Sequence, residues 1–339
     1  MDAVVGAFMT AHGVPGLSLA IARNGEMAYA KGYGFADRSS GEKVKPSSLF
    51  RIASVSKPIT SVALFTLIEQ GRLNLGDFVF GPGGVLRNDY GRTPYRRYVE
   101  QIRLHHLMTH TCGGWQNDGT DPMFQDPRLD QRELITWTVA NRPLTHAPGE
   151  QYAYSNFGYC VLGRVIEKVT GQPYADYVNE NVLKRCGISG MRIGGNTLVD
   201  RVSGEVVYYG ADGQDPYDMN VSRMDSHGGW LAAATHLVRF ATHVDGLSSR
   251  RDILRLDSIR QMTTPTPANS HYAKGWAVNN APIWWHNGSL PGTTSVMLRT
   301  ASGFCWAALA NYREISVNTG DALDKMMWDL VGQVKGWQA

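Results

Sequence analysis

The sequence lacks several features that would place it in a specialised class of protein. Charge is nearly balanced over the 339 residues, with a formal net charge of +3, and no basic run is interleaved with aromatic residues. Nucleic acid is therefore not an expected partner. No apolar run reaches the length that crosses a bilayer, so no membrane span is expected. A chain of this length can bury a large core, and one or two lobes are expected.

Cysteine is scarce as well. The four cysteines are scattered without a C-x-x-C pair, at Cys112, Cys160, Cys186 and Cys305. This spacing does not suit a zinc site, and it predicts buried thiols. We expect neither a metal ion nor a cofactor.

A signal-peptide pattern is also missing at the start of the sequence. The chain opens on a helix-like pattern of apolar residues that includes Val4, Val5, Phe8 and Met9. We therefore expect a cytoplasmic protein if this start is native, and a periplasmic or secreted one if a leader has been removed.

The most informative segment that the sequence does contain is residues 50–58, which predict a turn leading into a helix. Residues 59–71 are apolar on nearly every side, which is typical of a buried helix whose first turn points out of the core. Ser54 and Lys57 are three residues apart and share a face of that turn. A hydroxyl beside an amine is the composition of an activated nucleophile, and the helix amino end should lower the lysine pKa. An N-cap serine followed by an exposed lysine would give the same spacing.

The hydrophobic pattern predicts strands at both ends of the chain and helices between them. Strands are expected at 17–23, 27–33, 272–278, 283–286, 294–300 and 304–309, and helices at 102–109, 134–140, 157–169, 174–183, 231–244, 253–262 and 321–334. We predict an α+β fold in which an antiparallel β-sheet from both chain ends is flanked by helices, with an inserted, mostly helical lobe. Residues 1–60 and 270–339 would form the sheet lobe and 61–269 the helical lobe, with the active site between them.

Tyr154-Ser155-Asn156 forms a Y-x-N pattern on a loop just before a predicted helix. A tyrosine in this place can relay a proton to a leaving group, and an asparagine amide can hold a substrate carbonyl. A buried tyrosine followed by an N-cap at Asn156 would look the same. A second match, Tyr177-Val178-Asn179, lies inside a helical pattern and cannot project into a site.

His286-Asn287-Gly288 closes a predicted strand and leads into a turn at Leu290-Pro291-Gly292. A strand edge that ends in glycine can bring backbone N–H groups up to a reacting carbonyl. His227-Gly228-Gly229 is similar but has no flanking strand pattern. We therefore expect His227 to be structural or to line a pocket.

These three patterns, in this order, resemble those of the serine β-lactamase and penicillin-binding-protein superfamily. The likeness is to its class C β-lactamase-like branch, which includes β-lactamase-like esterases, D,D-peptidases, D-aminopeptidases and some acyltransferases. The resemblance extends over almost the whole chain, since further segments fit at residues 14–18, 107–111, 148–150 and 228–230.

The resemblance implies a catalytic role for each matching residue. Ser54 would be the acylated nucleophile, and Lys57 and Tyr154 the pair that transfers protons. The backbone N–H groups of Ser54 and Ser289 would form the oxyanion hole.

The resemblance also implies that Asn156, His286, Gly288 and Gln116 bind the substrate. One departure from the family pattern is important here. The third motif of β-lactamases is usually K-T-G, whose lysine attracts a substrate carboxylate. Histidine stands in its place in this chain, and a histidine is mostly neutral at pH 7. This weakens the case for a dedicated β-lactamase.

Together these features predict a serine hydrolase that forms an acyl-enzyme on Ser54 with a small-molecule ester, amide or D-peptide. An esterase of the β-lactamase-like type is favoured, because tryptophans flank the motifs and an aromatic wall suits an apolar group. They are Trp115, Trp230, Trp276, Trp284 and Trp285, and strand alternation allows only one of the last two to face the site. A D,D-peptidase, a D-aminopeptidase, a weak β-lactamase, an acyltransferase and a non-catalytic binding protein stay open. The oligomeric state is not predicted.

Overall fold

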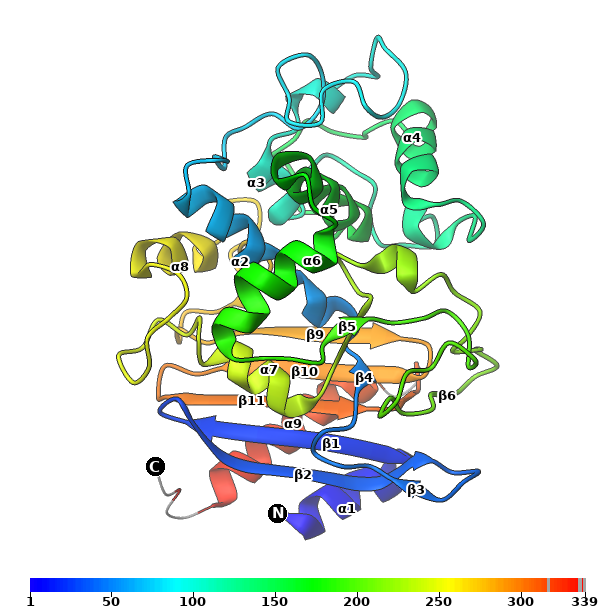
Figure 1. Cartoon of the computed structure of the whole chain (residues 1–339), viewed down its shortest axis with the longest axis vertical. Coiled ribbons are helices and arrows are strands. Elements are labelled where there is room, and N and C mark those ends of the chain that lie inside the picture. Colours follow the sequence, from blue (N-terminus) through cyan, green and yellow to red (C-terminus); the bar gives the residue numbers. More distant parts are fainter. Residues whose placement is uncertain (316–317, 335–336, 338–339) are drawn as a thin grey trace.

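The computed structural model of the chain describes residues 1–315, 318–334 and 337. Its main strands are β1 (Gly16–Arg23), β2 (Glu26–Asp37), β3 (Glu42–Lys43), β8 (Ala277–Val278), β9 (Trp284–Leu290), β10 (Thr293–Arg299) and β11 (Phe304–Ala310). They form one antiparallel sheet in the order β3-β2-β1-β11-β10-β9-β8, in the lower half of Figure 1. The two ends of the chain meet where β1 pairs with β11, from Leu17 opposite Ala310 to Arg23 opposite Phe304. The predicted sheet from both chain ends is confirmed.

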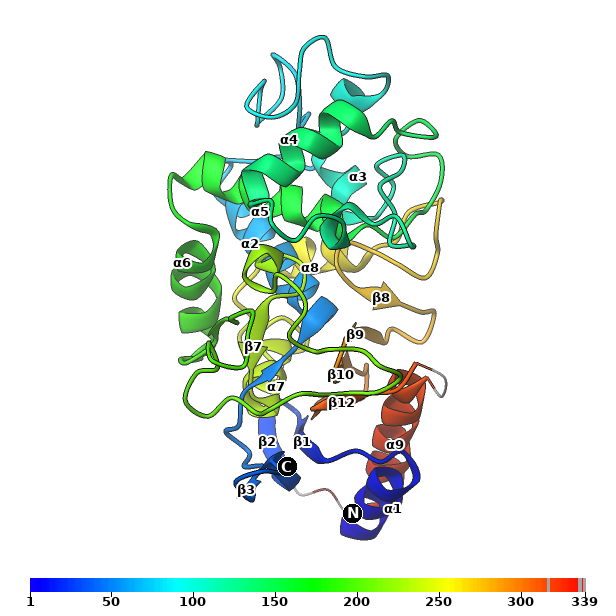
Figure 2. The same cartoon turned by 90° about the vertical axis from the view of Figure 1, so that its right-hand side faces the viewer.

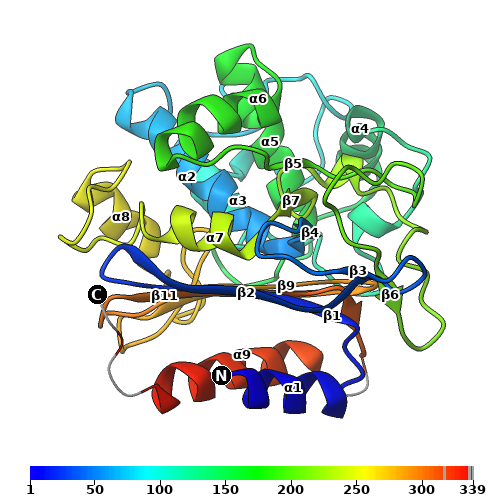
Figure 3. The ribbon, with the colours of Figure 1, turned by 60° about the horizontal axis from the view of Figure 1, so that its bottom comes forward.

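Helices cover both faces of this sheet (Figure 3). The helices α1 (Asp2–Ala11) and α9 (Thr319–Gln333) lie together on one face. Alternate residues of β1, among them Leu17 and Leu19, point to that face and are fully buried in a core shared with both helices. The intervening residues of β1 face the larger core on the other side.

The opposite face of the sheet is covered by α7 (Ala234–Ala241), which packs on β1, β10 and β11. Small side chains on this face of β1, Ala20 and Ala22, leave room for the helix. The helix α7 therefore belongs spatially with the sheet, although it lies within residues 61–269. The division of the chain into two lobes stays a prediction.

The predicted helix at 231–244 begins too early. Trp230–Ala232 instead form β7, which pairs with β4 (Phe50–Arg51) and with β5 (Arg192–Ile193). Both partners are distant in sequence, and such non-local pairing leaves no mark in the helical periodicity of the segment itself. The expected strand at 272–278 is likewise reduced to Ala277–Val278.

The rest of the molecule is mostly helical and lies above the sheet in Figures 1 and 2. Its helices are α2 (Ser56–Glu69), α3 (Leu104–Met108), α4 (Gln131–Asn141), α5 (Asn156–Thr170), α6 (Tyr174–Val178) and α8 (Leu256–Thr263). Shorter elements are η1 (Ala53–Val55), η2 (Val99–Gln101), η3 (Pro122–Phe124), η4 (Asn179–Leu183), η5 (Lys184–Cys186) and η6 (Ser222–Met224), and β6 (Tyr209–Gly210) pairs with β12 (Tyr312–Arg313). Every residue of α2 from Ser56 to Leu67 is buried, which confirms the predicted buried helix.

All four cysteines lie in the part of the chain that the structure describes. Each of them is buried and carries a free thiol, as predicted. Within the described residues, no helix combines the length and the apolar character that crossing a bilayer requires.

Candidate active site

Ser54 lies in η1, the short turn of 3-10 helix directly before α2. The backbone of this turn is anchored to the sheet, because the Ser295 hydroxyl on β10 donates a hydrogen bond of 2.8 Å to the Ile52 carbonyl. Ala53 has a φ of 46°, a left-handed conformation that residues with a side chain rarely adopt. Such strain persists only where the surroundings hold it. Ser54 therefore stands on a turn that the sheet holds in place.

The strand β9 passes unusually close to this turn at Gly288. A Cβ atom at Gly288 would lie 2.3 Å from the Ile52 carbonyl oxygen and 2.3 Å from the Ser295 hydroxyl. Only glycine allows so close an approach of the two backbones. Gly288 also lines the cavity beside Ser54, but its contact with a substrate stays a prediction.

Lys57 lies in the first turn of α2 and is completely buried. Its Nζ lies 2.9 Å from Ser54 Oγ, and it donates hydrogen bonds to Asn156 Oδ1 at 2.8 Å and to the His227 carbonyl at 3.0 Å. Burial lowers the pKa of Lys57 well below its ordinary value, while the nearby Asp121 carboxylate acts in the opposite direction. The pKa of Lys57 is thus lowered as the sequence predicted, but the largest cause is burial and not the helix amino end. An amine with a lowered pKa can accept the serine proton.

Tyr154 lines the same cavity as Ser54. Lys57 Nζ lies 4.8 Å from the centroid of the Tyr154 ring. Burial raises the pKa of Tyr154 above its ordinary value, and the neighbouring Ser54 hydroxyl offsets part of the rise. The phenol therefore keeps its proton near neutral pH and can donate it.

The loop that carries Tyr154 ends at the N-cap of α5. This cap is Ser155, whose hydroxyl accepts a hydrogen bond of 2.9 Å from the Gly158 backbone N–H. The alternative interpretation of the sequence put the cap one residue later, at Asn156. Because Ser155 takes this role, the Asn156 side chain is available for Lys57.

The Asn156 amide is held by protein atoms at both ends. Its Oδ1 accepts from Lys57, and its Nδ2 donates to Asp121 Oδ2 at 2.9 Å and to Asn117 Oδ1 at 3.1 Å. Asn156 also lines the smaller of the two cavities at Ser54. Its predicted contact with a substrate amide stays a prediction.

His286 on β9 takes part in a buried hydrogen-bond network. Its Nδ1 donates to the Asn287 carbonyl at 2.7 Å and its Nε2 accepts from the Tyr272 hydroxyl at 3.0 Å, an assignment that these partners dictate. Burial lowers the pKa of His286 to about 3, so the ring is neutral near pH 7. His286 is not among the described residues that line the cavities at Ser54. A role in substrate binding stays a prediction.

Two adjoining cavities, of about 420 and 320 Å³, open at the nucleophile. Four residues line both of them: Ser54, Asn117, Ser289 and Arg313. The smaller cavity adds an apolar group, which consists of Phe124, Met224, Leu290 and Pro291. His227 lines this cavity too, which confirms its expected structural and pocket-lining place.

Ser289 is placed to offer its backbone N–H to this cavity. The two-residue turn Pro291-Gly292 makes Leu290 and Thr293 a hydrogen-bonded pair, and bonded pairs alternate with unbonded ones along an antiparallel ladder. The Ser289 N–H is therefore expected to point away from β10, toward the cavity that Ser289 shares with Ser54. The oxyanion hole stays a prediction.

Sequence reasoning chose Gln116 for the acyl side of the site, but its neighbour Asn117 lines the cavities. Gln116 is exposed, and its Nε2 donates to Asp118 Oδ2 at 2.6 Å. The Asn117 backbone N–H donates to the Tyr154 carbonyl at 2.6 Å, which brings this loop over the nucleophile. The substrate-binding role of Gln116 stays a prediction. Arg313 and the buried Asp121 carried no motif and were also missed.

The tryptophans do not form an aromatic wall at Ser54. Trp230 and Trp276 are fully buried, and Trp115 is 5% exposed. Trp284 and Trp285 pack into different cores on opposite faces of β9, so the predicted alternation is confirmed. None of the five lines the described part of either cavity, and the aromatic argument for an esterase is therefore not supported.

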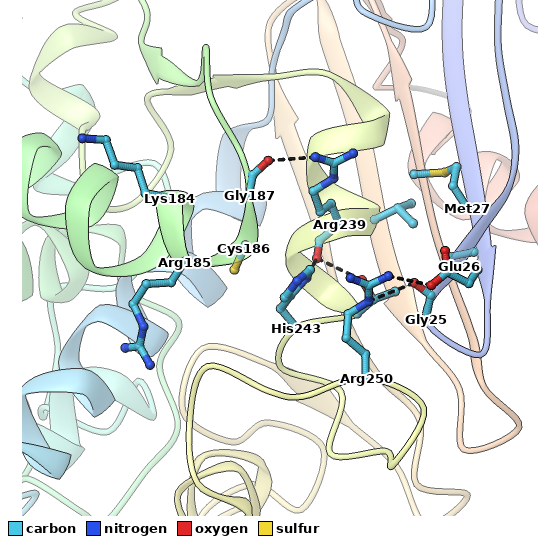
Figure 4. Close-up of a pocket in the computed structure, with 13 residues that line it drawn as sticks. Gly25, Glu26, Met27, Lys184, Arg185, Cys186, Gly187, Arg239, His243 and Arg250 are labelled. Carbon is cyan, nitrogen blue, oxygen red and sulfur yellow. Dashed lines mark hydrogen bonds and ion pairs between the residues drawn. The ribbon is translucent and has the colours of Figure 1, made fainter.

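A separate cavity of about 530 Å³ lies at the β1–β2 turn and α7 (Figure 4). Its basic side chains are already engaged: Arg239 donates to the Gly187 carbonyl, and Arg250 donates to the Gly25 carbonyl and pairs with Glu26. The residues described around Ser54 are not part of its lining.

Residues 1–323 match the Beta-lactamase family model. The chain belongs to the β-lactamase family. The resemblance recognised in its motifs, to a family of serine hydrolases, is therefore confirmed.

Curated relatives match over much of the chain. Protein flp from Staphylococcus aureus (strain MRSA252) is 26% identical over 307 residues, which cover 88% of this chain and 60% of that protein. Esterase EstB from Burkholderia gladioli is 32% identical over 210 residues, or 56% of this chain and 49% of that protein. The matched part of the chain therefore spans 60% of the length of Protein flp and 49% of the length of esterase EstB.

Solved structures share the fold over nearly the whole chain. The octameric penicillin-binding protein homologue from Pyrococcus abyssi has a TM-score of 0.77 at 23% identity, covering 98% of this chain and 76% of that chain. D-amino acid amidase from Ochrobactrum anthropi SV3 has a TM-score of 0.79 at 21% identity, and the match covers 98% of this chain and 99% of that chain. The predicted α+β fold is therefore confirmed.

Proposed function

We propose that this chain hydrolyses carboxylic esters through an acyl-enzyme on Ser54. The observation that carries the proposal is the 2.9 Å contact between Ser54 Oγ and Lys57 Nζ, made by an amine that is completely buried. Burial favours the neutral amine, which can take the hydroxyl proton as Ser54 Oγ attacks the ester carbonyl carbon. The Tyr154 phenol lines the same cavity as Ser54 and, because burial raises its pKa, keeps a proton that it can donate.

In the first half of the reaction, the bond from Ser54 Oγ to the carbonyl carbon forms and the ester C–O bond breaks. The proton of Ser54 passes to Lys57, and the departing alkoxide receives a proton from Tyr154 and leaves as an alcohol. Lys57 then returns its proton to the tyrosinate, so both groups regain their starting protonation states. The backbone N–H groups of Ser54 and Ser289 would stabilise the oxyanion.

In the second half, a water molecule attacks the acyl carbon and the bond to Ser54 Oγ breaks. The water gives one proton to Lys57, and Ser54 Oγ takes a proton back from Lys57 as the carboxylic acid leaves. Both halves need one base and one acid near Ser54, and the positions of Lys57 at 2.9 Å and of Tyr154 in the same cavity support these roles.

Two observations favour an ester as the substrate. The relative with 32% identity bears the name esterase EstB. The smaller cavity at Ser54 is lined in part by Phe124, Met224, Leu290 and Pro291, which suit an uncharged acyl or alcohol group. An alcohol is also a better leaving group than an amine and needs less assistance from an acid.

A second candidate is the hydrolysis of an amide or peptide that bears a charged group. Arg313 lines both cavities at Ser54, and its guanidinium has no hydrogen-bond or ion-pair partner among the described residues. A guanidinium in that position would recognise a carboxylate on the substrate. The fold neighbour from Ochrobactrum anthropi SV3 bears the name D-amino acid amidase.

The test combines labelling with a substrate panel. A fluorophosphonate should label Ser54, as located by peptide mass spectrometry, and Ser54→Ala should abolish both labelling and turnover of p-nitrophenyl esters. Ser56→Ala is the matched control, because Ser56 is a fully buried neighbour whose hydroxyl has no hydrogen-bond partner in the described structure. Labelling of another serine would overturn the assignment. A preference for D-amino-acid anilides or nitrocefin over the esters would favour the second candidate.

A further inference from the structure

Asp121 is a buried acid beside the proposed catalytic groups that no motif accounts for. It lies at the N-cap of η3, in a long polar loop, and is 1% exposed. Its Oδ1 accepts from the Met123 backbone N–H at 2.9 Å, and its Oδ2 accepts from Asn156 Nδ2 at 2.9 Å. An ionised carboxylate can only accept hydrogen bonds. The amide group that faces Asp121 must therefore be the NH2 group of Asn156.

This contact decides which end of the Asn156 amide meets Lys57. With Nδ2 directed at Asp121 and Asn117, Oδ1 is left as an acceptor 2.8 Å from Lys57 Nζ. The His227 carbonyl is a second pure acceptor, 3.0 Å from the same nitrogen. A neutral amine has two N–H donors and one lone pair. Both donors are therefore taken by these acceptors, and the lone pair is left for the hydroxyl of Ser54.

We propose that Asp121 is a positioning residue that, by fixing the orientation of the Asn156 amide, aims the lone pair of Lys57 at Ser54. This inference rests on the proposed role of Lys57 as the base of an acyl-enzyme mechanism. If the amide were reversed, its NH2 group would face Lys57 and attract the lone pair away from Ser54. Asp121 is not itself among the described residues that line the two cavities, and it contacts Asn156, which is, so it acts through Asn156.

Asp121 also places a negative charge near Lys57. Among the groups that act on Lys57, Asp121 favours the ammonium, whereas burial opposes it. The other titratable groups around Lys57 are Tyr154, Tyr159, His110, His227 and His286, and burial keeps each of these in its neutral form near pH 7. Burial raises the pKa of Asp121 itself to about 6, so it carries its charge near pH 7, and removing that charge should extend the neutral form of the Lys57 amine to lower pH.

The test starts from Asp121→Asn, which keeps the shape of the side chain but has only one acceptor oxygen. If that oxygen keeps the Met123 N–H, the new NH2 group opposes the NH2 group of Asn156 and reverses its amide. We expect kcat on a p-nitrophenyl ester to fall roughly tenfold to hundredfold, as for a misplaced catalytic group, with little change in KM. The acid limb of kcat/KM should also move to lower pH. Asp118→Asn is the matched control: the Asp118 side chain is exposed and its hydrogen bonds in the described structure are with Gln116 and Thr120, so its loss should leave both measurements unchanged.

The exchanged pair Asp121→Asn with Asn156→Asp provides the rescue. The amide introduced at position 121 would then donate to the carboxylate introduced at position 156, whose second oxygen accepts from Lys57. We expect kcat at the pH optimum of the exchanged variant to be at least tenfold higher than that of Asp121→Asn. The acid limb of its kcat/KM profile should lie at higher pH than in the wild type, because the carboxylate at position 156 now contacts Lys57 Nζ directly. Opposite shifts of the limb in the single and the exchanged variants would not arise from a purely structural defect.

The inference is overturned if folded Asp121→Asn keeps the wild-type kcat and pH profile, or if the exchanged pair folds but recovers no activity. Thermal unfolding of each variant establishes that it is folded. Rates of fluorophosphonate labelling separate this failure from that of the proposed function. Equal labelling rates of Ser54 in the wild type and in Asp121→Asn would refute only the role of Asp121, whereas no labelling of Ser54 in the wild type would refute the mechanism on which it rests.

Discussion

Replacing Gly288 by alanine tests whether the close approach of β9 positions the nucleophile. The added Cβ would lie 2.3 Å from the Ile52 carbonyl oxygen and 2.3 Å from the Ser295 hydroxyl. Ordinary contacts between non-bonded heavy atoms are about 3.5 to 4.0 Å, so the two sides must separate by more than about 1 Å. The Ile52 carbonyl is two residues from Ser54 and accepts the hydrogen bond that anchors the turn. The displacement should therefore reach Ser54.

Two separate effects are expected from Gly288→Ala. Overpacking should lower the free energy of unfolding by about 1 to 3 kcal/mol. A shift of about 1 Å at the nucleophile should lower kcat/KM on a p-nitrophenyl ester roughly 100-fold. The loss of activity should exceed what the folded fraction explains, because a protein of ordinary stability stays almost entirely folded after a loss of this size.

The assay pairs steady-state kinetics with urea unfolding under the same conditions. Gly332→Ala in α9 is the matched control, because no heavy atom of the described residues lies within 4 Å of the added Cβ. In that helix the control should gain about 0.5 to 1 kcal/mol of stability and keep full activity. If Gly288→Ala retains kcat/KM within about threefold, well inside the effect of a 1 Å shift, the approach of β9 does not position Ser54.

Two further predictions concern protons. Lys57→Ala and Tyr154→Phe should each lower kcat roughly 100-fold or more. The double variant should be little worse than the poorer single variant, because both residues act on the Ser54 hydroxyl. Additive free energies in the double-mutant cycle would show that their roles are independent. Burial lowers the pKa of His286 in the folded state to about 3. The unfolded chain therefore binds one more proton than the folded chain between about pH 6.5 and 3, and the free energy of unfolding falls as the pH falls through that range. His286→Gln should flatten the decline of the urea midpoint between about pH 6.5 and 4.5, and an unchanged slope would contradict the pKa shift.

The order of the motifs and the periodicity of the chain were enough to predict the family, the sheet built from both chain ends and the buried helix under Ser54. Each of these predictions starts from a pattern within a short stretch of sequence. The S-x-x-K spacing places Ser54 and Lys57 on one turn, and the apolar residues after it require that the helix be buried. The alternation of Trp284 and Trp285 across β9 follows from strand geometry in the same way.

The tertiary structure decided how those residues are used, because their partners come from segments far apart in the chain. Ser155 rather than Asn156 caps α5, so the Asn156 amide is available to connect Asp121 with Lys57. The segment at Trp230–Ala232 became a strand because β4 and β5 pair with it.

The electrostatics of the site were likewise set by burial, which periodicity does not report. The lowered pKa of Lys57 comes mainly from the removal of water around its amine rather than from the helix end that the sequence suggested. The neutral state of His286 has the same cause, since the ring is enclosed between Tyr272 and its own strand. A sequence names the groups that can exchange protons, and the packing around them sets the pH at which they do so.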